Sequence, residues 1–254
     1  MSRTPAPART KGAATLDDFA GFPAAGFIFL RALKRHNERD WFEERREAFE
    51  RGVRAPMAAL VEALDVRMAT IAPEIVGDPK KSVFRIHRDV RFSKDKSPYK
   101  TFLAAWLFHR DQGRSAAMRA HGGSAGVYVH FEPGASFIAG GMWLPPSATL
   151  ERVRRTLVDD VAGFERAAAS RAFVARYGGL TDEAMLTRPP RGFESDGPAA
   201  RWLRYRSFMA SRPIPDDDMR SAALPDLLTD DLAALAPLVR WLNAALGYRA
   251  ADRR

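Results

Sequence analysis

The sequence predicts an α+β fold, in which a central antiparallel sheet of about four or more strands is flanked by N-terminal and C-terminal helices. Apolar residues recur every three or four positions in the first and last thirds of the chain, which is typical of amphipathic helices. In the middle third the period changes to two, which is typical of strands. Because the strands cluster and do not alternate with helices, a parallel α/β sheet is not expected.

The chain is long enough to form one domain with its own core. Its 254 residues include 46% hydrophobic and 28% charged residues, a composition typical of globular proteins. We expect a single α+β domain over residues 16–254, preceded by a flexible basic tail over residues 1–15. This tail carries Arg3, Arg9 and Lys11 but lacks the apolar core of a secretory signal.

Two absences narrow the class of protein. The sequence has no cysteine, which excludes disulfides, thiolate zinc sites and a cysteine nucleophile, and favours a cytoplasmic location. The longest largely apolar run, residues 22–30, is far shorter than the roughly 20 residues that span a bilayer. We therefore expect a cytoplasmic protein without a membrane partner.

Three helices are expected before the sheet. The first ends near His36, and Asn37 is a favourable N-cap for a second helix that runs to about Arg51. A third helix ends at Pro73. Its apolar residues recur at helical spacing: Met57, Leu60, Val61, Leu64, Met68 and Ile71.

The strands are expected from Val83 onward, where apolar and polar residues begin to alternate. The apolar face of this first strand carries Phe84, Ile86, Val90 and Phe92. The polar face carries Arg85, His87, Asp89 and Arg91. Residues 102–108 are apolar on both faces and suit a central strand. Residues 127–132 and 136–143 flank a Pro-Gly-Ala turn and predict a hairpin.

Helical periodicity returns after this hairpin. Residues 150–161 predict one helix, and residues 235–246 predict a C-terminal helix. We expect the latter to be interrupted at Pro237, because proline removes a backbone hydrogen bond and clashes with the preceding turn.

The positive charge of the chain is concentrated in residues 80–100, which we call the cationic segment. This segment holds eight lysines and arginines against Asp89 and Asp95, a net charge of +6 out of +9 for the chain. Five of the seven lysines of the chain fall within it. A focused field of this kind suits a small anionic ligand better than an extended nucleic-acid surface.

Residues 85–100 read RIHRDVRFSKDKSPYK and resemble the hallmark RxxRDxRFxxDKxxYK of the "domain of unknown function 2461" family. The resemblance extends over residues 19–246. It includes Gly21-Phe22-Pro23, Asp40-Trp41-Phe42, Tyr128-Val129-His130 and Pro190-Arg191-Gly192-Phe193. The resemblance implies a shared fold and a shared surface, and it implies no reaction.

The cationic segment is the predicted binding site. Residues two apart on a strand lie about 7 Å from one another on the same face, close enough to share one ligand. The ligand-binding candidates are Arg85, Arg91, Lys94, Lys96, Tyr99 and Lys100. Asp89 and Asp95 are the catalytic candidates as general bases, or they hold the neighbouring cations in place. Arg88 falls on the apolar face, where it is either a core ion pair or a site residue.

A second predicted strand contributes further candidates. Tyr128, His130 and Glu132 share one face and would line the same pocket if this strand neighbours the first. Because the histidines lack a metal-ligand spacing, no metal site is predicted. Residues 122–126 match G-x-S-x-G, but strand-like residues follow where a nucleophile elbow needs a helix. No glycine-rich nucleotide loop occurs, so the sequence indicates no particular cofactor.

Three functions remain open at this stage. The first is binding of a small anionic or phosphorylated ligand, with or without catalysis. The second is a nucleic-acid-binding module, in which the tail and the cationic segment contact phosphates while Phe92 or Tyr99 stacks on bases. In the third, the charged motif is purely structural and its ion pairs fix the shape of the chain.

Overall fold

The structure is a computed structural model that describes residues 19–91, 94–112, 123–183 and 185–251. Its centre is a five-stranded antiparallel sheet in the order β1-β2-β3-β4-β5. The strands are β1 (Ile75–Val76), β2 (Leu103–His109), β3 (Gly126–Phe131), β4 (Phe137–Met142) and β5 (Phe208–Pro213). The predicted α+β class is therefore confirmed. The predicted basic tail lies outside the described residues.

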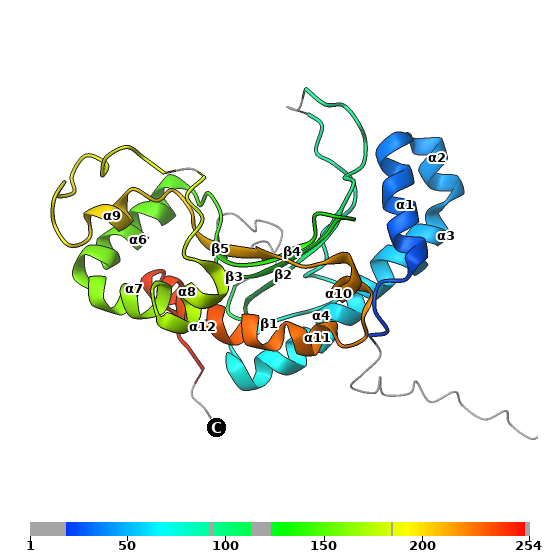
Figure 1. Cartoon of the computed structure of the whole chain (residues 1–254). Coiled ribbons are helices and arrows are strands. Elements are labelled where there is room, and N and C mark those ends of the chain that lie inside the picture. The colour runs from blue at the N-terminus through cyan, green and yellow to red at the C-terminus, as the bar shows by residue number, and fades with distance from the viewer. Residues whose placement is uncertain (1–18, 92–93, 113–122, 184, 252–254) are drawn as a thin grey trace, which may run out of the picture.

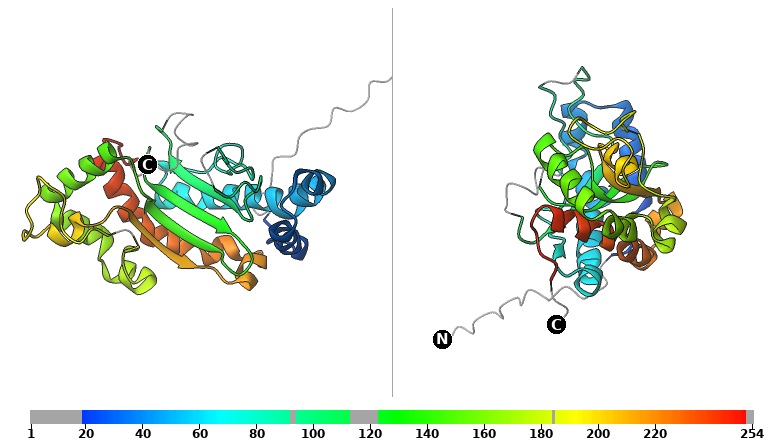
Figure 2. Two further views of the ribbon diagram at one scale, coloured as in Figure 1. Left: turned by 90° about the horizontal axis from the view of Figure 1, so that it is seen from above. Right: turned by 90° about the vertical axis from the view of Figure 1, so that its left-hand side faces the viewer.

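Two long helices, α4 (Ala55–Ile71) and α12 (Thr229–Ala245), lie together across one face of the sheet (Figure 1). Helix α1 (Ala24–Arg35) with α2 (Arg39–Glu44) and α3 (Arg46–Phe49) lies beyond one end. The opposite end carries α6 (Ser147–Asp159), α7 (Val161–Ala168), α8 (Arg171–Tyr177) and α9 (Ala200–Leu203). Two short helices, α10 (Asp216–Arg220) and α11 (Leu224–Leu227), precede α12. Seen from above, no helix of the described chain covers the second face of the sheet (Figure 2).

Strand β2 is buried on both faces, as predicted for a central strand. Its Leu103, Ala105 and Leu107 belong to the main core against the helices. The alternate residues Trp106 and Phe108 form a smaller cluster on the outer face. The sheet thus has a helix-covered inner face and an aromatic outer face. The predicted hairpin is also confirmed, as β3 and β4.

No regular strand forms over residues 83–91, the described part of the strand predicted from Val83. The chain there is extended and forms two isolated bridges, Val83 with Ala105 of β2 and His87 with Tyr99 before β2. Val83 and His87 are four positions apart, whereas their partners Tyr99 and Ala105 are six positions apart. Two extra residues therefore bulge from the pairing on the partner side.

The irregular pairing also corrects the predicted faces of this segment. Phe84 packs in the outer aromatic cluster, whereas Ile86 packs in the main core, and the chain bends at Ile86. The two side chains therefore do not share a face. Strict alternation holds only for a regular ladder, which the bulge interrupts.

The helix predicted over residues 37–51 is also broken. The chain forms α2 and α3 and then a π-helical turn, η1 (Glu50–Arg54), which leads into α4. A Cβ atom added to Gly26 of α1 would lie 2.1 Å from the carbonyl oxygen of Gly52. The two backbones therefore meet at a glycine pair that no larger residue could replace without displacement.

The predicted interruption at Pro237 is wrong, since α12 continues through it. An interior proline costs a helix about 3 kcal/mol. Burial of a leucine side chain gains about 1.5–3 kcal/mol, and Leu235, Leu238 and Leu242 of this helix are all fully buried. Packing against the sheet therefore outweighs the local preference. Strands β1 and β5 were not predicted, because β1 has two residues and β5 includes Arg212 and Pro213.

A buried carboxylate joins α12 to β5 and α8. Asp231 is fully buried and accepts hydrogen bonds from Arg176 Nε at 2.7 Å, Arg212 Nε at 2.6 Å and the Tyr177 hydroxyl at 2.8 Å. Burial alone would raise the pKa of Asp231, but the donors Arg212, Arg176 and Tyr177 together lower it. The ionised form is therefore the stable one in the folded protein.

Replacement of this carboxylate should destabilise the fold. We expect Asp231→Asn to lower the free energy of unfolding in urea by about 3–5 kcal/mol at pH 7, because two arginines lose their buried counter-charge. Since the folded-state pKa is lowered, this difference should shrink as the pH falls below about 3.8. The neighbouring Asp230 is exposed, so Asp230→Asn should change stability by less than about 0.5 kcal/mol. Equal effects of the two substitutions would contradict this account.

Candidate ligand-binding pocket

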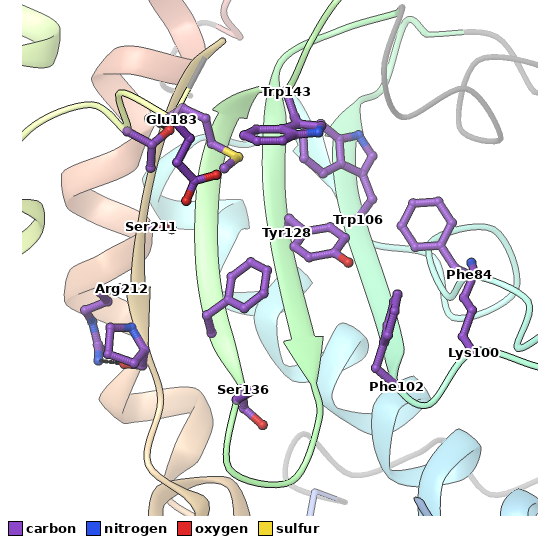
Figure 3. A pocket seen from close by; sticks show the side chains of 15 residues that line it. Phe84, Lys100, Phe102, Trp106, Tyr128, Ser136, Trp143, Glu183, Ser211 and Arg212 are labelled. Carbon is purple, nitrogen blue, oxygen red and sulfur yellow. Dashed lines mark hydrogen bonds between the residues drawn. The ribbon is translucent and has the colours of Figure 1, made fainter. Parts of the chain in front are cut away.

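A pocket of about 760 Å³ lies on the outer face of the sheet and extends from the cationic segment across β2, β3 and β4 to β5 (Figure 3). Most of its surface is apolar. Six aromatic side chains line it: Phe84, Phe102, Trp106, Tyr128, Phe137 and Trp143. Its polar lining consists of Lys100, Ser136, Thr181, Glu183, Ser211 and Arg212.

Strand register aligns several of the lining side chains. Trp106, Tyr128, Ala139 and Ser211 lie in one row across four strands, and all of them except the buried Ala139 line the pocket. The Trp106 ring lies over Gly126, where an added Cβ atom would be 2.9 Å from two ring carbons. A glycine is therefore required beneath this indole, because any side chain would displace it from the pocket wall.

Among the described lysines and arginines of the cationic segment, Lys100 is the one that lines the pocket. Its ammonium group lies 5.6 Å from the centre of the Phe84 ring and 5.8 Å from that of Phe102, within range of a cation–π interaction. Burial, with the nearby positive charge of Arg85, lowers the pKa of Lys100. Lys100 and Phe102 also border a second hollow of about 330 Å³ together with Arg88, Asp89 and Thr101.

Tyr128, His130 and Glu132 form a hydrogen-bonded chain along the outer face of the sheet. The Tyr128 hydroxyl lies 3.2 Å from His130 Nδ1, and His130 Nε2 lies 3.2 Å from a Glu132 oxygen. The His130 ring is stacked between Phe102 and Phe137, with centroid distances of 4.2 and 4.6 Å. The predicted sharing of one face is confirmed, and Tyr128 lines the pocket.

Burial changes the pKa values of Tyr128 and His130. It lowers the pKa of His130, although Glu132 opposes the shift, and Lys100 adds to it. Burial also raises the pKa of Tyr128 to about 12. At neutral pH both side chains are therefore uncharged.

The acidic residues of the cationic segment pair with its arginines. Arg91 donates two hydrogen bonds to Asp89, at 2.9 and 2.7 Å, and these bonds lower the pKa of Asp89 to about 2. Arg88 forms an ion pair with Asp95 and donates a hydrogen bond to Ser97 Oγ at 2.9 Å. The predicted role of Asp89 and Asp95 as counter-charges matches this geometry. A lowered pKa makes Asp89 a weak base at neutral pH.

Tyr99 does not face the pocket. Its ring is buried and stacks on Phe42 at a centroid distance of 4.1 Å. Asn37 clamps its backbone, since Asn37 Nδ2 donates to the Tyr99 carbonyl at 2.9 Å and Asn37 Oδ1 accepts from the Tyr99 N–H at 3.0 Å. Tyr99 therefore anchors the loop next to Lys100, and its ring is not part of the pocket lining.

The other predicted cations do not converge on one cleft. Arg85 and Lys94 are exposed, and Lys96 donates to the Val90 carbonyl at 3.0 Å. Trp106, Trp143 and Glu183 line the pocket but were not predicted as site residues, because they lie outside the segment where charge is concentrated. The sequence signal that points to this outer face is the presence of aromatic residues at alternate positions of the strands.

The G-x-S-x-G match is not a nucleophile elbow. Ser124 is buried, and its backbone N–H donates to the side-chain oxygen of Gln112 at 3.0 Å. Strand β3 follows directly, as the sequence predicted. No group of three or more metal-ligating side chains comes together in the described part of the chain.

Comparison with protein families identifies the class of this protein. A family model described as conserved hypothetical protein (DUF2461) matches residues 25–241, most of the chain. The chain belongs to this family, and the predicted family is thereby confirmed. Neither curated proteins nor solved structures give a significant match. No helix in the described ranges is long and apolar enough to cross a membrane.

The clamp on Tyr99 should be required for a rigid loop at the pocket. We expect Asn37→Ala to lower the free energy of unfolding by about 1–3 kcal/mol, because two partly buried backbone groups lose their partner. Trypsin should also cleave residues 85–100 faster in this variant, since the loop opens more often. The exposed neighbour provides a control, and Glu38→Ala should stay within about 0.5 kcal/mol of the wild type. Unchanged stability of Asn37→Ala would refute the role of the clamp.

Proposed function

We propose that this protein binds a small molecule that combines a flat apolar ring with an anionic group. The observation that carries the proposal is the Lys100 ammonium at the border of an aromatic pocket. The ligand would place its anion on Lys100 and its ring among the aromatic side chains. The proposal refines the sequence-based prediction of a small anionic or phosphorylated ligand.

The environment of Lys100 supports the anionic group. Among the described residues, no carboxylate oxygen lies within 4.0 Å of the Lys100 ammonium. The positive charge of Arg85 contributes to the lowered pKa of Lys100 and is repulsive. A partly buried cation without a counter-charge is costly, and an anion bound in the pocket would remove this cost.

The shape and lining of the pocket support the ring. Pockets for small molecules typically measure about 300–1,000 Å³ and have mostly apolar walls with a few polar groups, and this pocket fits that description. Flat rings pack favourably against aromatic faces at offset or perpendicular angles. Trp106 of β2 and Trp143, which follows β4, offer such faces (Figure 3). Phe137 of β4 offers a further one.

The nucleic-acid alternative has less support. Arg88 and Arg91 are paired with Asp95 and Asp89, and the buried Tyr99 ring is not accessible for stacking on a base. Phe92, the other predicted stacking residue, lies outside the described residues. The exposed Arg85, Lys94 and Lys96 would still offer phosphate contacts, so a salt titration of nucleic-acid binding distinguishes this alternative.

The structural alternative accounts for part of the motif. The pairs Arg88–Asp95 and Arg91–Asp89 and the anchor at Tyr99 give the loop its shape. In our proposal this shape delivers Lys100 to the pocket, so the structural and binding roles complement each other. The absence of cysteine supports the predicted cytoplasmic location.

A binding screen tests the proposal. The panel contains indole-3-acetate, 4-hydroxyphenylacetate, phenyl phosphate and nucleoside monophosphates, each with a neutral amide or alcohol counterpart. We expect at least one anion to raise the melting temperature and to bind in calorimetry. Lys100→Gln should raise its Kd roughly 10- to 150-fold, because a charge-assisted hydrogen bond contributes about 1.5–3 kcal/mol.

The matched control removes a charge elsewhere in the cationic segment. Lys94 is exposed, so Lys94→Gln should leave the Kd within about twofold of the wild-type value. Equal losses in both variants would indicate a diffuse electrostatic surface and contradict the proposed pocket. Tight nucleic-acid binding that weakens steeply with salt would favour the alternative.

A further inference from the structure

The hydrogen-bonded chain behind Tyr128 determines which atom Tyr128 presents to the pocket. Glu132 lies at the outer end of this chain, with Lys34 of α1 at 3.9 Å from it. As a carboxylate, Glu132 can only accept hydrogen bonds, so His130 Nε2 must carry the proton between them. This assigns the tautomer of His130 as long as its ring is neutral.

The neutral ring in turn fixes the Tyr128 hydroxyl. With its proton on Nε2, His130 has only a lone pair at Nδ1, which lies 3.2 Å from the Tyr128 oxygen. The Tyr128 hydroxyl must therefore donate its proton toward His130. Its oxygen then keeps lone pairs for a hydrogen-bond donor in the pocket.

We infer that Tyr128 is a specificity-determining hydrogen-bond acceptor, so that the ligand carries a hydroxyl, amine or ring N–H toward Tyr128 in addition to its anionic group. This inference rests on the proposed function and narrows its ligand class. Tyr128 lines the same pocket as Lys100 and differs from it in polarity, since the Lys100 ammonium only donates.

Trp106 contributes to the pocket wall with its ring and not with its N–H. The residue is 5% exposed, and its Nε1–H is buried without a hydrogen-bond partner in the described part of the chain. A buried N–H without accessible surface does not reach a ligand in the pocket. The polar pattern that a ligand must match is therefore one donor, Lys100, and one acceptor, Tyr128.

Protonation of His130 reverses the polarity of Tyr128. A charged imidazole has protons on both nitrogens, so Nδ1–H donates to the Tyr128 oxygen and the hydroxyl proton turns toward the pocket. The charged groups around His130 are Glu132, which favours the charged ring, and Lys100, which opposes it, with Lys34 beyond Glu132. Glu183 and Arg212 also line the pocket. Because burial lowers the pKa of His130, the reversal occurs below the ordinary value of about 6.5.

The test compares pairs of probes in which a methyl group replaces one N–H or O–H hydrogen. Indole-3-acetate is paired with 1-methylindole-3-acetate, and 4-hydroxyphenylacetate with 4-methoxyphenylacetate, by calorimetry at pH 8.0 and at lower pH values. In at least one pair, wild-type protein at pH 8.0 should bind the unmethylated probe about 5-fold or more tightly than its methylated partner. The preference should fall at those lower pH values at which His130 is protonated. It should vanish in Tyr128→Phe and persist in Tyr205→Phe, a tyrosine that does not line the pocket.

A measurement without ligand tests the tautomer directly. Long-range ¹H–¹⁵N spectra of the imidazoles, with the His130 signals assigned from His130→Gln, should show a neutral ring protonated at Nε2 at pH 8.0. Protonation at Nδ1 would overturn the inference, because the Tyr128 hydroxyl would then be free to donate to a ligand. Because the tautomer is read from the wild-type protein, this result does not depend on whether Tyr128→Phe folds correctly.

The outcomes separate this inference from the proposed function. Lys100-dependent binding without a preference for the unmethylated probes would overturn the acceptor role of Tyr128 and leave the proposed pocket intact. Failure of all four probes and of the wider anion panel to bind wild-type protein would overturn both.

Discussion

The Lys100 ammonium lies against the rings of Phe84 and Phe102 in a partly buried position, and the surrounding loop is organised around that placement. Tyr99, the residue before Lys100, is fixed by a buried ring and by two hydrogen bonds to Asn37. On the other side of Lys100, two extra residues bulge from the pairing that leads into β2. The position of the charge is therefore determined by covalent neighbours that are rigidly held, and not by an ion pair of its own.

This placement depends on the asymmetry of the sheet. Helices α4 and α12 cover the inner face, so the aromatic residues of the outer face remain available to a ligand (Figure 2). Asp231 ties α12 to β5 and α8 and thereby holds the edge of the sheet that completes the pocket. On the central strands, core residues and pocket-lining residues thus lie on opposite sides of the sheet, as the period of two along a strand requires. Arg212 of the edge strand β5 belongs to both sets, since it binds Asp231 and also lines the pocket.

The sequence predicted those features that depend on local pattern. Apolar periodicity placed α4, β2 and the hairpin, and the shared face of Tyr128, His130 and Glu132 followed from their spacing. The bulge before β2 was not predictable, because nothing in residues 83–105 specifies the pairing register. The charge pattern indicated where the cationic residues lie along the chain but not how their side chains are oriented. The ion pair of Arg91 with Asp89 and the hydrogen bonds of Tyr99 with Asn37 were therefore not predictable. Trp106 and Ser211 belong to the pocket through strand register, which requires the tertiary structure.

The most direct measurement of the central claim follows Lys100 itself. The chain has only seven lysines, so NMR of protein labelled at the lysine side chains can resolve and assign each ammonium group by substitution. We expect Lys100 to titrate below the other lysines, because it is partly buried beside Arg85. Addition of an aromatic carboxylate or phosphate that binds should raise the pKa of Lys100 and shift its signal, while the other six remain unchanged. A Lys100 that titrates like a solvent-exposed lysine and does not respond to any bound anion would contradict the account.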